Sequence, residues 1–126
     1  MILLDHLTLA VRDWRASRAF YVEHLGFRPE FEVPEGGPYG LGVAALQDDA
    51  GLTLFLEQTM PPIASGQGSL TIQVEDVHAF HDRLSGADLD FMAPPGVHFW
   101  GYGAVLADPD GHVLHVWDKA SMEANG

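Results

Sequence analysis

Histidines and carboxylates are the side chains through which this chain could bind a metal ion or transfer a proton. The sequence has seven histidines and eighteen acidic residues but no cysteine, so no thiolate can act as a nucleophile or a metal ligand. Two histidines, His6 and His115, and one acid, Glu57, lie in segments that alternate like strands. No phosphate-binding glycine loop, dinucleotide fingerprint or nucleophile elbow is present. The available chemistry is therefore that of imidazole and carboxylate groups.

The other five histidines carry less weight as candidate site residues. His78 and His81 are three residues apart on a predicted helix, where a solvated helix face is the simpler interpretation. His24 falls at a predicted helix end and His112 in a predicted turn. His98 begins an aromatic stretch and could reach the mouth of a cavity.

The chain contains an internal duplication. Residues 6–13 align with residues 69–76 at an offset of 63, and Leu, Thr, Val and Asp coincide. Both segments alternate as a half-buried strand does, and both end in an aspartate suited to cap a helix. The spacing that follows predicts helices over about residues 14–25 and 77–84.

A second repeat closes each half. Residues 51–57 align with residues 111–117 at an offset of 60, each segment beginning with a glycine. The sequence between the repeats predicts strands at about 27–33, 41–46, 89–92 and 100–107, so that each half has the order βαβββ. The proline- and glycine-containing tract 58–68 is the natural joint, and Asp108-Pro109-Asp110-Gly111 predicts a turn before the last strand.

Period-two alternation predicts which side chains face the core and which face a cavity. One parity, which includes Leu7, Leu9 and Val116, is mostly apolar and is expected to pack on the helices. The opposite parity mixes polar and aromatic side chains, which is typical of a lined cavity, with a solvated face or a dimer contact as alternatives. This second set includes His6, Thr8, Phe55, Glu57, Ser69, Thr71, His115 and Trp117.

Together these features resemble the vicinal oxygen chelate superfamily, which includes glyoxalase I, extradiol dioxygenases and bleomycin-resistance proteins. The resemblance rests on the paired modules, the opening His6-Leu-Thr-Leu-Ala-Val, Phe20-Tyr21 before Leu25-Gly26-Phe27, and Trp100-Gly-Tyr ahead of Asp-Pro-Asp-Gly. It implies an α+β fold in which two tandem βαβββ modules form a curved mixed sheet around a concave cavity, with the helices outside. One domain over residues 1–126 is expected, with modules at about 1–58 and 68–118, a joint at about 59–67 and a short C-terminal tail.

In metal-binding proteins that resemble this chain, ligands come from the first and the last strand of each module. Those positions hold His6, Phe55, Ser69 and His115 here, so two of the four are good ligands. A bulge before the strand that contains Glu57 would bring this carboxylate in as a third ligand. Two histidines and a carboxylate can hold a divalent metal such as Fe, Zn, Ni or Mn. No cofactor is the primary expectation, because two imidazoles alone rarely retain a catalytic metal; both histidines would then be hydrogen-bonded cavity residues.

The resemblance implies two functions. The preferred one is a small-molecule-binding protein, similar to the bleomycin-resistance branch, that sequesters or carries a planar or cationic ligand. Its stacking surfaces would come from Phe55, Phe99, Trp100, Tyr102 and Trp117. The alternative is a metal-dependent enzyme, either a glyoxalase-like isomerase or lyase or a ring-cleaving dioxygenase, in which Glu57 moves the proton. Metal content separates the two.

Length and charge limit the class of protein and of partner. A chain of 126 residues fits one domain, contains no membrane-length apolar run and begins without the basic region of a secretory signal. We therefore expect no membrane partner and a cytoplasmic location. The formal charge of −12 disfavours nucleic acid and favours a cationic ligand, although scattered acids also simply solvate a surface. A homodimer is expected from the resemblance, since open sheets leave edges that subunits commonly cover.

Overall fold

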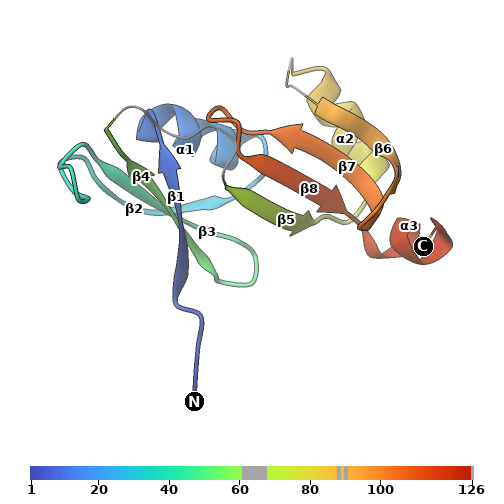
Figure 1. Cartoon of the computed structure of the whole chain (residues 1–126), viewed down its shortest axis with the longest axis horizontal. Coiled ribbons are helices and arrows are strands. Elements are labelled where there is room, and N and C mark those ends of the chain that lie inside the picture. The colour runs from blue at the N-terminus through green and yellow to red at the C-terminus, as the bar shows by residue number, and fades with distance from the viewer. Residues whose placement is uncertain (61–67, 88, 90, 126) are drawn as a thin grey trace. The chain divides into compact units, whose positions relative to one another are not determined.

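The computed structural model describes residues 1–60, 68–87, 89 and 91–125, and the chain divides into two compact units, residues 1–64 and 65–126 (Figure 1). The first contains β1 (His6–Val11), α1 (Trp14–Glu23), β2 (Arg28–Val33), β3 (Val43–Gln47) and β4 (Thr53–Gln58). The second contains β5 (Ser69–Gln73), α2 (Val77–Ser85), β6 (Phe91–His98), β7 (Gly101–Ala107), β8 (Val113–Trp117) and α3 (Lys119–Asn125). The predicted α+β fold of two tandem βαβββ modules is confirmed.

Each unit arranges its strands in a mixed four-stranded sheet, with the orders β1-β4-β3-β2 and β5-β8-β7-β6. In both sheets the first strand of the module pairs in parallel with the last, and the other pairs are antiparallel. The helix carries the chain from the first strand to the opposite edge of the sheet, and the next two strands bring it back, so that the last strand lies beside the first. The strands that carry the candidate site residues are therefore neighbours. Thr8 lies opposite Phe55, and Thr71 lies opposite His115.

The duplication extends to the caps and turns. Asp13 before α1 and Asp76 before α2 have extended backbones, and each carboxylate accepts hydrogen bonds from two N–H groups of the following turn. The turns before β4 and β8 are also alike. In each, the Oδ1 atom of the first aspartate, Asp48 or Asp108, accepts from the N–H groups two and four residues further on.

A side chain at the end of each sheet holds the start of the helix of its own unit. In the first unit the backbone N–H of Trp14 donates to Gln58 Oε1 at 3.0 Å. In the second unit the N–H of Val77 donates to Asp118 Oδ2 at 2.7 Å. The same local constraint therefore fixes α1 and α2, although one acceptor is a neutral amide and the other a carboxylate.

The apolar parity of β1, β4 and β8 contributes buried side chains to the core of each unit, as predicted, whereas Leu70 and Ile72 of β5 are only half-buried. In the first unit the buried set includes Leu9, Val11, Leu54 and Leu56 with Phe20 and Tyr21 of α1. In the second it includes Leu106, Leu114 and Val116 with Phe80 and Leu84 of α2. Leu7 departs from the pattern and is 38% exposed, at the beginning of β1.

The second unit differs from the sequence prediction in two elements. β6 extends to His98 and includes Pro94 and Pro95, which an edge strand tolerates, and its pairing with β7 has two register shifts. The residues after 118 were predicted to form a short tail, but Lys119–Asn125 form the helix α3. Most of the predicted joint at 59–67 falls on residues 61–67, which lie outside the described residues. No helix in the described part of the chain combines the length and apolar character that crossing a bilayer requires.

Candidate ligand-binding site

A pocket of about 450 Å³ opens on the sheet of the second unit, on the face opposite the buried core. This volume lies within the range of small-molecule sites. The pocket has a floor on β5 and β8, one wall from the turn between β6 and β7, and one wall from α3. Its lining residues are Ser69, Thr71, His115, Trp117, Phe99, Trp100 and Met122.

Three of the four side chains on the floor of the pocket, Ser69, Thr71 and His115, are polar, and the fourth is Trp117. Thr71 and His115 lie side by side in the parallel pair, and Ser69 Oγ is 3.5 Å from His115 Nδ1. Hydroxyl and imidazole groups can donate and accept hydrogen bonds. Among the described residues that line the pocket, none is Asp, Glu, Lys or Arg. The floor is therefore suited to the polar edge of an organic molecule.

Trp100 forms an aromatic wall whose position is fixed from several sides. Its indole stacks on His98 at a centroid distance of 5.2 Å and an interplanar angle of 4°, and meets His115 at 5.2 Å and 68°. His98 Nε2 donates to the carbonyl of Gly103 at 3.0 Å, since a carbonyl can only accept. A Cβ atom at Gly103 would lie 2.6 Å from Trp100 Cη2 and closer still to the carbonyl oxygen of Val116. Only glycine at this position allows the indole to lie against β7.

Met122 on α3 forms the opposite wall, a role that strand alternation does not predict. Its Sδ atom accepts from the backbone N–H of Tyr102 at 3.2 Å. Gly101 beneath it has φ +134°, and a Cβ atom there would lie 2.5 Å from Met122 Sδ and 2.7 Å from Cε. The signal that could have revealed this wall is Asp118, an N-cap residue directly before Lys119-Ala120-Ser121-Met122.

Asp118 is buried, and it anchors α3 beside the pocket. Burial acts to raise the pKa of Asp118, but hydrogen bonds from the Val77 and Ser121 N–H groups and the Ser121 hydroxyl, with the charge of His78, outweigh it and hold this pKa below its usual value. The three hydrogen bonds measure 2.7, 2.6 and 2.9 Å respectively. An ionised carboxylate therefore joins the start of α2 to the start of α3.

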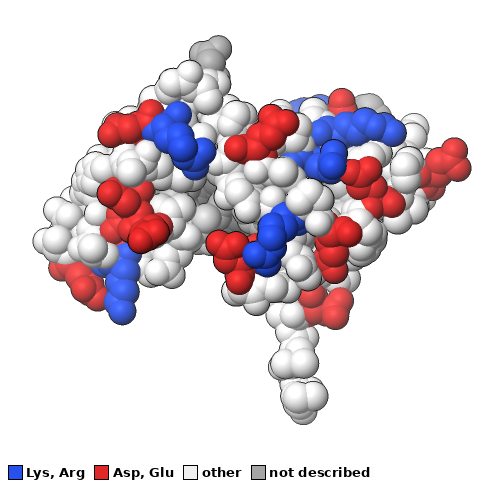
Figure 2. All heavy atoms as spheres, turned by 180° about the vertical axis from the view of Figure 1, so that it is seen from behind, with Lys and Arg blue, Asp and Glu red and all other residues white. Residues whose placement is uncertain are grey.

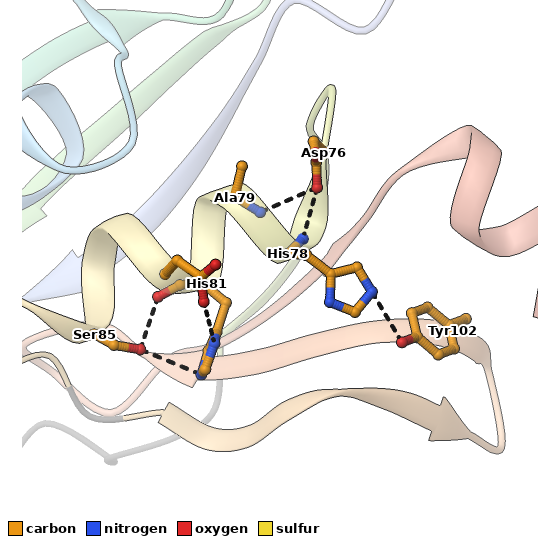
Figure 3. Close-up of polar contacts among 7 residues, drawn as sticks. Asp76, His78, Ala79, His81, Ser85 and Tyr102 are labelled. Carbon is orange, nitrogen blue, oxygen red and sulfur yellow. Dashed lines mark hydrogen bonds and ion pairs between the residues drawn. The ribbon is translucent and has the colours of Figure 1, made fainter.

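Tyr102, which the sequence analysis placed among the stacking residues, lies on the other side of this sheet. Its hydroxyl is 3.0 Å from His78 Nε2 on α2 (Figure 3). Strand alternation explains this position. Gly103 is on the pocket side of β7, so its neighbour Tyr102 points to the opposite side, which the helix covers. His81 has different partners, Ser85 and the ring of Phe91, so His78 and His81 form no shared site.

The predicted site residues of the first unit lie on the corresponding face of β1 and β4. The ring of His6 packs on Phe55 at a centroid distance of 4.3 Å, and Phe31 of β2 meets Phe55 edge-on at 5.9 Å. Thr8 lies opposite Phe55 in the parallel pair. His6 Nδ1 is also 2.9 Å from Asp5 Oδ2. The structure thus brings His6, Thr8 and Phe55 together around an aromatic cluster.

The donor atoms within each unit do not fit a three-ligand metal site. Glu57 lies opposite Ala10, four residues along β1 from His6, which is about 13 Å at ordinary strand rise. Neither ladder of β4 has the register shift that would move Glu57 toward His6. Among the residues that the structure describes, no three His, Asp or Glu side chains form a group that could hold a metal ion.

Comparison with known proteins identifies both family and fold. The profile of the Glyoxalase/Bleomycin resistance protein/Dioxygenase superfamily matches residues 3–116, whereas no curated protein sequence matches. TnmS3, an antibiotic binding protein from Streptomyces sp. CB03234, is 27% identical with a TM-score of 0.76, over 93% of this chain and 96% of that chain. UcmS2 is 25% identical with a TM-score of 0.72, over 92% and 97% of the two chains.

A third solved structure supports the fold alone. It is a superfamily member from Sphaerobacter thermophilus DSM 20745, 20% identical with a TM-score of 0.75, over 94% of this chain and 98% of that chain. The profile match covers both βαβββ modules except for Trp117, the last residue of β8. The chain therefore belongs to the glyoxalase/bleomycin resistance protein/dioxygenase superfamily.

Proposed function

We propose that this protein binds a planar aromatic small molecule in the pocket of the second unit and sequesters or carries it. The observation that carries the proposal is the pairing of a polar floor, formed by Ser69, Thr71 and His115, with the indoles of Trp100 and Trp117 in one pocket. A fused-ring ligand would stack on the indoles and present its polar edge to the floor. Each stacked pair contributes about 0.5–1.5 kcal/mol beyond the area that it buries.

The charge of the protein favours a cationic form of such a ligand over an anionic one. The formal charge of −12 raises the local concentration of cations at any part of the surface. An indole face also attracts a cation, by about 0.5–2 kcal/mol. The resemblance to TnmS3, an antibiotic binding protein, supports an organic ligand of natural-product size.

The three tryptophans make a direct test possible. Trp14 lies in the first unit, where it is 2% exposed, and does not line the pocket. Because the chain has three tryptophans, a Trp14→Phe background leaves only Trp100 and Trp117, both in the pocket, to give tryptophan fluorescence. We expect 9-aminoacridine, a planar cation, to quench this emission saturably, and its neutral isostere acridone to do so more weakly. His115→Ala and Ser69→Ala should weaken binding measured by calorimetry. Saturable quenching by neither probe would count against the proposal.

Metal content separates this function from the metal-dependent enzyme that the sequence also suggested. Protein purified without chelator should contain far less than one Fe, Zn, Ni or Mn per chain. A stoichiometric metal that is lost from both His6→Ala and His115→Ala would overturn the binding-protein proposal. Loss of the same metal from Glu57→Ala would identify the third ligand.

A further inference from the structure

Helix α3 is held to the second unit at two residues. No residue of α3 itself is buried. The helix is tied at its start by the buried carboxylate of Asp118, which accepts from the N–H and the hydroxyl of Ser121, and one turn after Asp118 by the side chain of Met122. Met122 then reaches β7, where its sulfur accepts the hydrogen bond from Tyr102.

The backbone of β7 makes room for the Met122 side chain. Gly101 has a φ that favours glycine, and any side chain there would occupy the space of Met122 Sδ and Cε. Met122 consequently lies low enough to line the pocket with Trp100 and Trp117. The opposite side of Trp100 is fixed by its stacking on His98. The pocket therefore has one rigid wall and one wall that consists of a flexible thioether.

We infer that Met122 is the specificity-determining residue of this pocket, and that α3 sets the width of the ligand that can lie beside Trp100 and Trp117. The inference rests on the proposed function, because it concerns the same pocket. Methionine has three rotatable side-chain bonds and no branch, so it can adapt its shape to a ring system that the rigid tryptophan wall cannot accommodate. Shortening Met122 should widen the pocket, and a bulky replacement should narrow it.

The first experiment needs no bound ligand. In the Trp14→Phe background, acrylamide quenching reports how accessible Trp100 and Trp117 are. Met122→Ala should raise the acrylamide quenching constant by at least about half, because removing a side chain exposes the surface that it covered. Met122→Leu, which keeps nearly the same volume, should restore the value of the parent. Glu123→Ala, on the neighbouring exposed position of α3, should leave it unchanged.

The second experiment uses aromatic cations of increasing width: 4-aminoquinoline, 9-aminoacridine and ethidium. Met122→Ala should raise the dissociation constant of 4-aminoquinoline about tenfold, as expected for about 1.4 kcal/mol of lost contact. The same variant should bind ethidium as well as the parent does, or better, so the ratio of the two dissociation constants changes. Met122→Trp should show the reverse order. An equal loss for all three probes would show a merely structural role and overturn the inference.

The two experiments separate failure of the inference from failure of the proposed function. If no probe binds the parent protein but Met122→Ala still exposes the tryptophans, the proposed function fails and the role of Met122 as a wall of the pocket stands. If probes bind but neither quenching nor the width preference responds to Met122, the inference fails and the binding function stands. Far-ultraviolet circular dichroism of each variant establishes that it is folded.

Discussion

The indole of Trp100 lies against β7 because Gly103 has no side chain. A methyl group at position 103 would overlap both Trp100 and the carbonyl of Val116 in the neighbouring strand. We predict that Gly103→Ala destabilises the protein by about 1–3 kcal/mol, the usual effect of overpacking, and displaces Trp100. Urea denaturation measures the first effect. A shift in the emission maximum of the Trp14→Phe background measures the second.

Gly96 provides the matched control for this prediction. It pairs with Gly103 across β6 and β7, but a Cβ atom there would approach nothing closer than 3.8 Å. Gly96→Ala should therefore change both stability and emission much less than Gly103→Ala. Equal effects of the two substitutions would mean that the sheet backbone, and not the contact with Trp100, is sensitive at these positions.

Strand parity was sufficient to predict most of the pocket floor. Ser69, Thr71, His115 and Trp117 share one parity of two strands, and the structure places all four in one pocket. The face of Tyr102 could not be predicted in the same way, because Tyr102 belongs to an aromatic run at a hairpin turn. A shift of one residue in the position at which the strand resumes after the turn moves each side chain to the opposite face of the sheet. Met122 was missed because its contribution depends on the fold of the residues after β8.

The side chains that hold the starts of α1 and α2 are the neutral amide of Gln58 and the carboxylate of Asp118. This difference in charge predicts that the free energy of unfolding is more sensitive to substitution at Asp118 than at Gln58. All partners of the Asp118 carboxylate are donors, the N–H groups of Val77 and Ser121 and the hydroxyl of Ser121. Asp118→Ala should lower the free energy of unfolding by about 3 kcal/mol, because it leaves buried donors without an acceptor. Gln58→Ala, which removes one neutral acceptor, should lower it by about 1 kcal/mol. Urea denaturation at neutral pH checks both values.

The contribution of Asp118 should also depend on pH. Its pKa in the folded protein is lowered, and in the unfolded chain it returns to about 3.9. The folded state thus binds fewer protons, and the stabilisation is fully present above the unfolded pKa and is lost as pH falls through the folded pKa. The difference in unfolding free energy between the parent and Asp118→Asn should shrink as the pH falls below about 4, the range in which the carboxylate becomes protonated. A difference that grows on acidification would contradict this sign.

Elements were predictable where a residue pattern was repeated and less so where it was not. The repeated aspartates before α1 and α2 fixed both helix starts, at Trp14 and Val77, because the same cap forms in each unit. β6 was predicted too short, because prolines argue against a strand unless it lies at a sheet edge, and edge position is a property of topology. α3 has no counterpart in the first half, so the duplication gave no indication of it.

The net charge of −12 is a property of the whole chain that should act on a ligand from a distance. On the face shown in Figure 2, acidic side chains are distributed over the surface with Lys and Arg side chains between them. We predict that salt weakens the binding of 9-aminoacridine by a few-fold between 0.05 and 0.5 M, because screening removes a diffuse attraction. Acridone, which has the same ring system without the charge, should bind independently of salt. Equal salt dependence of the two would show that the field is irrelevant.

Homodimer formation is the prediction that concerns the whole chain. Each sheet has open edges, and the edge strands β2 and β6 expose apolar side chains, with Phe31 47% and Val97 73% exposed. The charges of Arg28, Glu30 and Glu32 protect β2 in part, whereas β6 carries prolines but no Asp, Glu, Lys or Arg, so the exposed apolar side chains are surface that a second subunit would cover. Sedimentation at tens of micromolar should therefore show a mass near twice the 13.7 kDa of one chain. Phe31→Lys or Val97→Lys should shift this equilibrium toward the monomer, whereas Ala79→Lys, on the exposed surface of α2, should not. A parent protein that remains monomeric throughout this range would mean that these edges are tolerated without a partner.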